Sequence, residues 1–235
     1  MARSVVSHER QYLLIDADDT LWENNIYFEQ AFASFCDFLN HSRLTPVEVR
    51  AVLDEIEIIN AKVHGYGSKN FGRNLKECYQ HLAERAIESH DLDRVMQFAE
   101  AILEQPIETI EGVPETLAYL AGRYDLTLFT KGDYEEQKLK VDRSGLGSYF
   151  GHTAIVKEKN TAAYRTLVDE RGLKHQRTWM IGNSPKSDIN PALDAGLNAV
   201  FVPHAHTWRL EHEEVQTGPG RMIQVERFAD LRSHF

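Results

Sequence analysis

Carboxylates gather directly after the first apolar run of the chain. Tyr12 to Ile15 lead into Asp16, Asp18 and Asp19 within four positions. Two carboxylates at i and i+2 point the same way and raise each other's pKa unless a cation lies between them. Magnesium suits carboxylate oxygens, and with the charge offset a carboxylate can attack a phosphoryl group. The stretch therefore predicts phosphoryl transfer, in which one aspartate attacks and the other moves the proton.

Polar side chains also follow three later apolar runs. A hydroxyl or an ammonium group there suits phosphoryl oxygens. Because the carboxyl ends of parallel strands define one ligand crevice, we expect these residues to meet the first aspartates. They are Thr130, Lys131 and Gly132 in LTLFTKGD, Lys157 and Lys159 in VKEKN, and Asn183 and Asp188 in GNSPKSD.

The elements that must position these residues alternate between strand and helix. Strands are predicted at Tyr12–Ile15, Leu126–Phe129, Thr153–Val156, Thr178–Ile181, Ala199–Val202 and Met222–Val225, and helices at Gly112–Arg123, Tyr134–Ser144, Thr161–Arg171 and Asn190–Ala195. This alternation predicts an α/β fold, a doubly wound parallel sheet with helices on both faces.

The segment from residue 21 to residue 110 differs, because its apolar residues recur at helical spacing throughout. We expect a helical cap at 21–110 and a Rossmann-like catalytic core at 1–20 and 111–235. Gly65, Gly67 and Gly72 predict a loop in the middle of the cap. Lys69 and Arg73 in and beside that loop are candidate substrate-binding residues, since such a loop can close over the core site.

These four motifs, in this order, resemble the haloacid dehalogenase-like hydrolase superfamily. DADDT matches its first motif, the threonine of LFTKGD its second, the lysine of VKEKN its third and GNSPKSD its fourth. The resemblance implies Asp16 as nucleophile, Asp18 as acid/base, magnesium as cofactor, and a cap that selects the substrate. Asp18 favours the phosphatase branch, because an alcohol leaving group needs a proton whereas a halide does not.

Two positions leave alternatives open. Asn183 stands where many family members have an aspartate that binds magnesium, so Asp188 is expected as the charged ligand with Asn183 in support, beside Asp16 and Asp18. For the active-site lysine we prefer Lys159, while Lys157 stays an alternative. The family resemblance also leaves open a phosphotransferase or mutase that uses the same aspartate, or a catalytically weak binding protein.

The composition of the chain argues against some classes of binding partner. The formal net charge of -10 argues against nucleic acid, and no run of 18 apolar residues suggests a membrane span. Cys36 and Cys78 show neither zinc-site nor disulfide spacing, which fits a reducing cytoplasm. We therefore expect a magnesium-dependent cytoplasmic phosphatase, a monomer or homodimer, that acts on a small phosphorylated metabolite.

Overall fold

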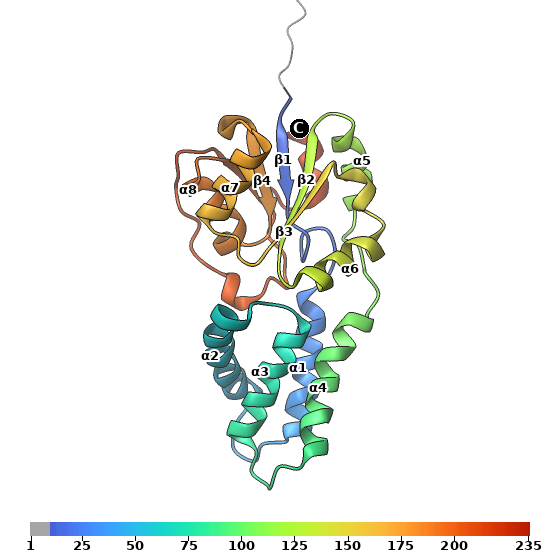
Figure 1. Cartoon of the computed structure of the whole chain (residues 1–235), viewed down its shortest axis with the longest axis vertical. Helices are drawn as coiled ribbons and strands as arrows, with labels where there is room; N and C mark the ends of the chain where they lie inside the picture. Colours follow the sequence, from blue (N-terminus) through green and yellow to red (C-terminus); the bar gives the residue numbers. More distant parts are fainter. Residues whose placement is uncertain (1–9) are drawn as a thin grey trace, which may run out of the picture.

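A six-stranded, all-parallel sheet forms the core of the computed structural model, which describes residues 10–235 (Figure 1). The strand order is β3-β2-β1-β4-β5-β6, so that β2 and β3 lie on one side of β1 and the later strands lie on the other. This is the doubly wound arrangement predicted. The strands are β1 (Tyr12–Ile15), β2 (Asp125–Lys131), β3 (His152–Val156), β4 (Thr178–Gly182), β5 (Asn198–Phe201) and β6 (Met222–Gln224).

Helices cover both faces of this sheet, and the two-residue period of β1 decides which side chains meet them. Leu13 and Ile15 pack on the side of α5 (Val113–Ala121) and α6 (Tyr134–Ser144), whereas Leu14 packs on the side of α7 (Thr161–Arg171) and α8 (Asn190–Asp194). All three side chains are fully buried. Strands buried on both faces read as continuous apolar runs, which is why the sequence revealed them.

Four helices lie together beyond the carboxyl ends of the strands, where the sequence predicts a cap, and we refer to them as the cap (Figure 1). One residue from each helix is fully buried in a cluster separate from those beside the sheet: Phe35, Leu53, Leu75 and Val95. This cluster supports the cap proposed at 21–110; residues 1–9 of the proposed core lie outside the described residues. The helices are α1 (Asn25–Leu39), α2 (Pro46–His64), α3 (Ser68–Leu82) and α4 (Ser89–Glu104).

The prediction of a loop through Gly72 was wrong, because α3 begins at Ser68 and includes it. A Cβ atom on Gly72 would lie 2.9 Å from Met96 Cε and 3.0 Å from Ala99 Cβ of α4. Glycine therefore serves here to let α3 and α4 approach closely, a packing role that a composition-based reading takes for a helix break.

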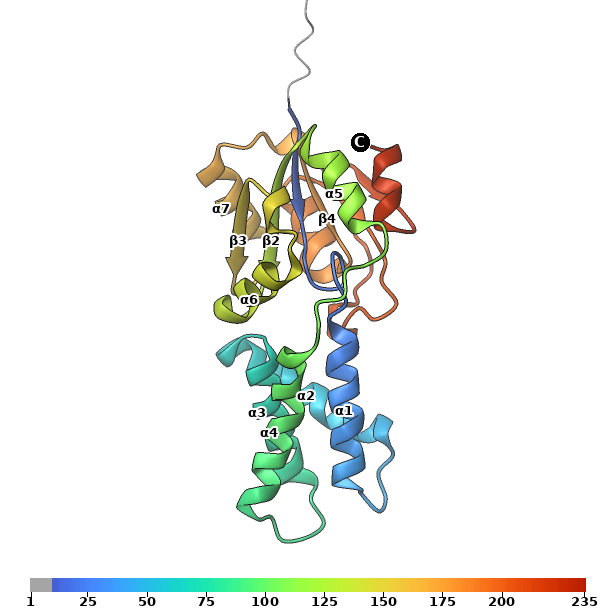
Figure 2. The ribbon, with the colours of Figure 1, turned by 90° about the vertical axis from the view of Figure 1, so that its right-hand side faces the viewer.

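Two chain segments connect the cap to the core and pair with each other (Figure 2). The Glu23 amide donates to the Glu108 carbonyl at 2.9 Å, and the Ile110 amide donates to the Leu21 carbonyl at 3.0 Å. Trp22, between them, is fully buried. Within residues 10–235, none of the helices has the length and apolar character needed to cross a membrane.

Candidate active site

A pocket of about 1030 Å³, its open mouth included, lies between the cap and the carboxyl ends of the strands. It brings together most of the residues that the sequence proposed, although they come from four separate strand ends. Those that line it are Asp16, Asp18, Thr130, Lys131, Gly132, Lys159, Asn183 and Asp188.

Asp16, directly after β1, faces a buried lysine. The Lys159 ammonium group donates to Asp16 Oδ1 and, at 2.7 Å, to Asp188 Oδ1. Burial, and then the neighbouring Asp188 carboxylate, raise the pKa of Asp16 to about 7, against the opposing effect of Lys159. Burial lowers the pKa of Lys159, but the two carboxylates outweigh it and raise that pKa above its ordinary value. The lysine thus stays charged between both aspartates.

Asp18 has a different set of partners. Its Oδ1 accepts from the Trp22 indole at 2.8 Å, and its Oδ2 accepts from Gln137 at 2.8 Å and from the Lys140 ammonium group at 2.9 Å. Burial opposes ionisation, but Lys140 and these hydrogen bonds lower the pKa of Asp18 below its ordinary value. Asp18 is therefore held as a carboxylate, the form that a general base needs.

The loop after β4 turns tightly around Asp188. A Cβ atom on Gly182 would lie 2.2 Å from Asp188 Oδ2, so that only glycine fits there. The Ser184 amide donates to Asp188 Oδ2 at 3.0 Å, and the Ser184 hydroxyl accepts from the Ser187 amide at 2.9 Å. Ser184 thus caps the π-helical turn Pro185–Ile189, a kind of turn that is frequent at functional sites.

Asn183 is fixed between two threonines. Its amide nitrogen donates to Thr207 Oγ1 at 2.8 Å, and its Oδ1 lies 3.2 Å from the Thr20 hydroxyl. That same hydroxyl lies 3.1 Å from Asp16 Oδ2, so Thr20 bridges the first and fourth motifs. These contacts direct the amide oxygen of Asn183 toward the side on which Asp16 lies.

The residues at the end of β2 line the pocket but differ in their exposure and in the hydrogen bonds that they already form. Thr130 is 1% exposed. The Gly132 amide already donates to the Val156 carbonyl at 2.9 Å. The Lys131 ammonium group donates to Glu211 Oε1 at 2.7 Å and to Ser187 Oγ at 2.8 Å, which leaves it a wall of the pocket with its charge balanced.

Three lysine and arginine candidates lie away from the pocket. Lys157, Lys69 and Arg73 are all exposed and do not line it. Lys69 and Arg73 belong to the solvent face of α3, whose opposite face packs in the cap. Between the two lysines that follow β3, the geometry therefore favours Lys159 as the one that acts.

The family model for haloacid dehalogenase-like hydrolases matches residues 13–202, which is most of the chain. The chain belongs to the haloacid dehalogenase-like hydrolase family. A haloacid dehalogenase-like hydrolase of Xanthomonas campestris is 32% identical, with a TM-score of 0.83 over 96% of this chain and 90% of that one. The likeness to this relative therefore extends over nearly the whole chain.

Two more distant relatives carry names with an activity. Pyrimidine 5'-nucleotidase PynA of Streptococcus pneumoniae is 29% identical over 137 residues, which span 55% of each chain. A 2-haloacid dehalogenase of Pseudomonas syringae is 17% identical, with a TM-score of 0.62 over 95% of this chain and 97% of that one. At that identity the dehalogenase shows the shared fold alone.

In this haloacid dehalogenase-like hydrolase, the oxygen atoms near Asp16 suit a hard divalent cation. Asp16, Asp188 and Asn183 offer two carboxylates and an amide oxygen, all buried, and Lys159 offsets only one of the two negative charges. Magnesium prefers such oxygen ligands. The Asp18 carboxylate accepts hydrogen bonds from Trp22 and from α6 on its two oxygens. Asp16 and Asp188 also accept on both of theirs, so hydrogen bonding does not separate the three carboxylates as ligands. The arrangement thus fits magnesium, and the Asp18 side chain stays a proposed ligand.

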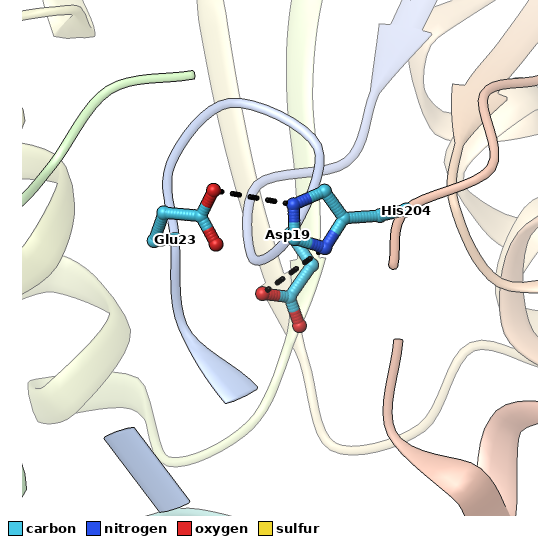
Figure 3. Close-up of side chains that lie close together, drawn as sticks. All are labelled: Asp19, Glu23 and His204. Carbon is cyan, nitrogen blue, oxygen red and sulfur yellow. Dashed lines mark hydrogen bonds and ion pairs between the residues drawn. The ribbon is translucent and has the colours of Figure 1, made fainter. Parts of the chain in front are cut away.

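A second polar group lies where the chain of this hydrolase enters the cap, and it consists of Asp19, Glu23 and His204 (Figure 3). Each offers one ligand atom, and the three atoms lie within 4.8 Å of one another. Asp19, however, already accepts from the backbone amides of Asn24 at 2.9 Å and Asn25 at 3.0 Å. His204 lies 3.3 Å from Glu23 and does not line the pocket. We interpret the group as a set of polar contacts that holds the segment after β5 against the segment that enters the cap.

Sequence reasoning missed Lys140 and Gln137, which reach Asp18 from α6. Both follow the TKGD motif on the helix that begins at Tyr134, and their spacing of three places them on one face. Lys140 and Gln137 are 7% and 4% exposed, values unusual for such polar residues in a helix. A polar pair at helical spacing directly after the second motif was the signal available.

Proposed function

We propose that this hydrolase is a magnesium-dependent phosphatase that cleaves small phosphorylated metabolites through an aspartyl-phosphate. The observation that carries the proposal is Asp16, a buried carboxylate at the end of β1 with the Lys159 ammonium group on Oδ1, and Asp18 two residues further on. Magnesium, when held by Asp16, Asp188 and Asn183, would supply positive charge to offset that of the phosphoryl group.

The reaction then divides into two displacements at phosphorus. In the first, Asp16 attacks phosphorus, the bond to the alcohol oxygen breaks, and that oxygen takes a proton from Asp18. In the second, water attacks phosphorus and gives a proton to Asp18, the bond to Asp16 breaks, and phosphate is released. Lys140, Gln137 and Trp22 favour the carboxylate form of Asp18, so they favour the second step, and Asp18 must be protonated before the first.

The buried partners of Asp18 also argue against dehalogenation. A halide leaves without a proton, so that reaction gives no use to a carboxylate with three dedicated donors. Similarity to a pyrimidine 5'-nucleotidase supports a phosphate monoester as substrate. The pocket lies between cap and core, which favours a small molecule that can be enclosed. Free thiols at Cys36 and Cys78 suit the cytoplasm, which we propose as the compartment.

Phosphate release from p-nitrophenyl phosphate and from a panel of phosphorylated metabolites tests the proposal. The wild-type protein with magnesium should release phosphate continuously, while Asp16→Asn should release none and keep its far-ultraviolet circular dichroism spectrum. A chelator should abolish turnover and added magnesium should restore it. Full activity of Asp16→Asn would contradict the proposed mechanism. A single burst of p-nitrophenol without phosphate, which continues only with an added alcohol acceptor that becomes phosphorylated, would indicate a phosphotransferase or mutase instead.

A further inference from the structure

The cap side of the pocket carries a carboxylate that has no hydrogen-bond partner among residues 10–235. Glu57, on α2, lines the pocket and is 6% exposed. Its Oε2 atom is buried and accepts no hydrogen bond within residues 10–235. Leaving such a group unsatisfied costs free energy, and a functional role is one reason for a protein to keep it.

The charged neighbours of Glu57 are paired elsewhere. Arg50 donates to Glu29 at 2.7 Å, and its guanidinium group lies 3.7 Å from the centre of the Phe32 ring. Asp54 forms an ion pair with Arg209 at 2.9 Å. Glu57 forms no ion pair within 4.0 Å in the described part of the chain, so its acceptor capacity is left for whatever fills the pocket.

The surroundings of Glu57 match one kind of molecular group. Phe28 and Phe71 also line the pocket, with ring centres 5.1 Å apart in an edge-on arrangement. Asn74, on α3, adds an amide to the same lining. Apolar ring surface next to a carboxylate and an amide suits a group with an apolar or planar body and N–H or O–H donors at its edge. Burial raises the pKa of Glu57 to about 7, so that a donor that pairs with the carboxylate would stabilise its ionised form.

We propose that Glu57 is a specificity-determining residue, accepting hydrogen bonds from N–H or O–H groups at the end of the substrate remote from the phosphate. The inference rests on the proposed function and deepens it. The substrates are then phosphate monoesters of alcohols that bear such donors, and esters with a distal carboxylate are disfavoured. The donors can belong to sugar hydroxyls or to the edge of a nucleobase.

Kinetics on four esters test this proposal. Uridine 5'-monophosphate presents a base N–H, glucose 6-phosphate presents hydroxyls, 3-phosphoglycerate presents a carboxylate, and p-nitrophenyl phosphate presents no donor. The wild-type protein should favour one of the first two over 3-phosphoglycerate. A preference for glucose 6-phosphate assigns the donor to sugar hydroxyls, and a preference for uridine 5'-monophosphate assigns it to the nucleoside. Glu57→Leu should lower kcat/KM on that ester by about tenfold or more, mainly through KM, because one hydrogen bond to a charged group is lost. On p-nitrophenyl phosphate it should stay within about twofold.

Two further variants separate specificity from folding. Glu57→Gln keeps one acceptor oxygen and should fall between wild type and Glu57→Leu. Glu55→Gln removes an exposed carboxylate from the same helix and should match wild type on every ester. An equal loss on all four esters, or 3-phosphoglycerate as the best wild-type substrate, would overturn the assignment.

Calorimetric titration keeps the inference distinct from the proposed function. The favoured ester is titrated into Asp16→Asn and into the double variant Asp16→Asn/Glu57→Leu, so that binding is measured without turnover. Where the wild type hydrolyses none of the esters, all four are titrated. About tenfold weaker binding of a donor-bearing ester to the double variant supports the role of Glu57 even where the phosphatase proposal fails. Equal affinities, or no measurable binding of any donor-bearing ester to Asp16→Asn, overturn it.

Discussion

The ammonium group of Lys140 lies 2.9 Å from Oδ2 of Asp18. Lys159 donates to Asp16, so these two of the three aspartates of the DADDT motif pair with different lysines. The two lysines come from different elements, α6 and the loop after β3. Two carboxylates two residues apart therefore avoid sharing one counter-charge, and their proton affinities shift in opposite directions.

Replacing Lys140 with methionine should impair the proton transfers of Asp18. Without the cation the pKa of Asp18 rises, so a smaller fraction is ionised at a given pH. The acidic limb of the pH profile of kcat/KM should move to higher pH, and activity at neutral pH should fall on the order of tenfold or more. Lys138→Met on the same helix is the control, because Lys138 is exposed and pairs with Asp142. An unchanged pH profile in Lys140→Met would show that Asp18 does not depend on it.

Activity should depend on Lys159 and not on Lys157. Lys159→Met removes a buried ammonium group from between Asp16 and Asp188, so we expect a loss of turnover on the order of a hundredfold. Removing one member of a buried ion pair is also destabilising, so thermal unfolding is measured in parallel. Lys157→Met, at an exposed position, should retain activity within about twofold. The reverse pattern would assign the third motif to Lys157.

Magnesium affinity should follow the charge at positions 183 and 188. Asn183→Asp replaces a neutral amide oxygen with a carboxylate and should tighten magnesium binding. Asp188→Asn removes a charged ligand and should weaken it, each by about tenfold or more, as measured by calorimetric titration of the metal. The opposite order of affinities would exclude these two side chains as the ligands.

Glu57 should make stability depend on pH. Its pKa of about 7 in the folded protein lies above the ordinary value of 4.5, because burial disfavours the charge. The folded state thus binds the proton more tightly than the unfolded state, so stability falls as pH rises from 4.5 to about 7 and is level above. Between pH 5 and pH 8, Glu57→Gln should gain on the order of 2 kcal/mol relative to wild type in urea unfolding. Glu55→Gln should show no such gain.

The fold was predictable because its strands are buried on both faces. Leu13, Leu14 and Ile15 form a continuous apolar run, and the residue after such a run must lie at the sheet edge where ligands bind. That rule located Asp16, Thr130 and Asp188 without any three-dimensional information. Lys69 and Arg73 rested on a different prediction, that of a loop in the cap, and α3 in place of that loop turned both to solvent.

The partners of the site residues were harder to foresee. Lys131 lies at the carboxyl end of a strand, yet its charge is balanced by Glu211, 80 positions further along the chain. Lys140 lies 122 positions from Asp18. Such pairings depend on how helices and loops pack over the sheet edge, and spacing in one sequence carries no record of contacts between distant segments. The sequence located the residues that we propose to react, and their counter-charges became visible only in the structure.

The close approach at Gly72 reverses a common rule of protein stabilisation. Replacing glycine with alanine inside a helix usually stabilises it by about 1 kcal/mol. In this protein the added methyl group would meet Met96 and Ala99 and push two cap helices apart. Phe71, the preceding residue, forms part of the wall opposite Asp16. A Gly72→Ala substitution intended to stabilise α3 would therefore change the shape of the pocket in which we propose that the substrate binds.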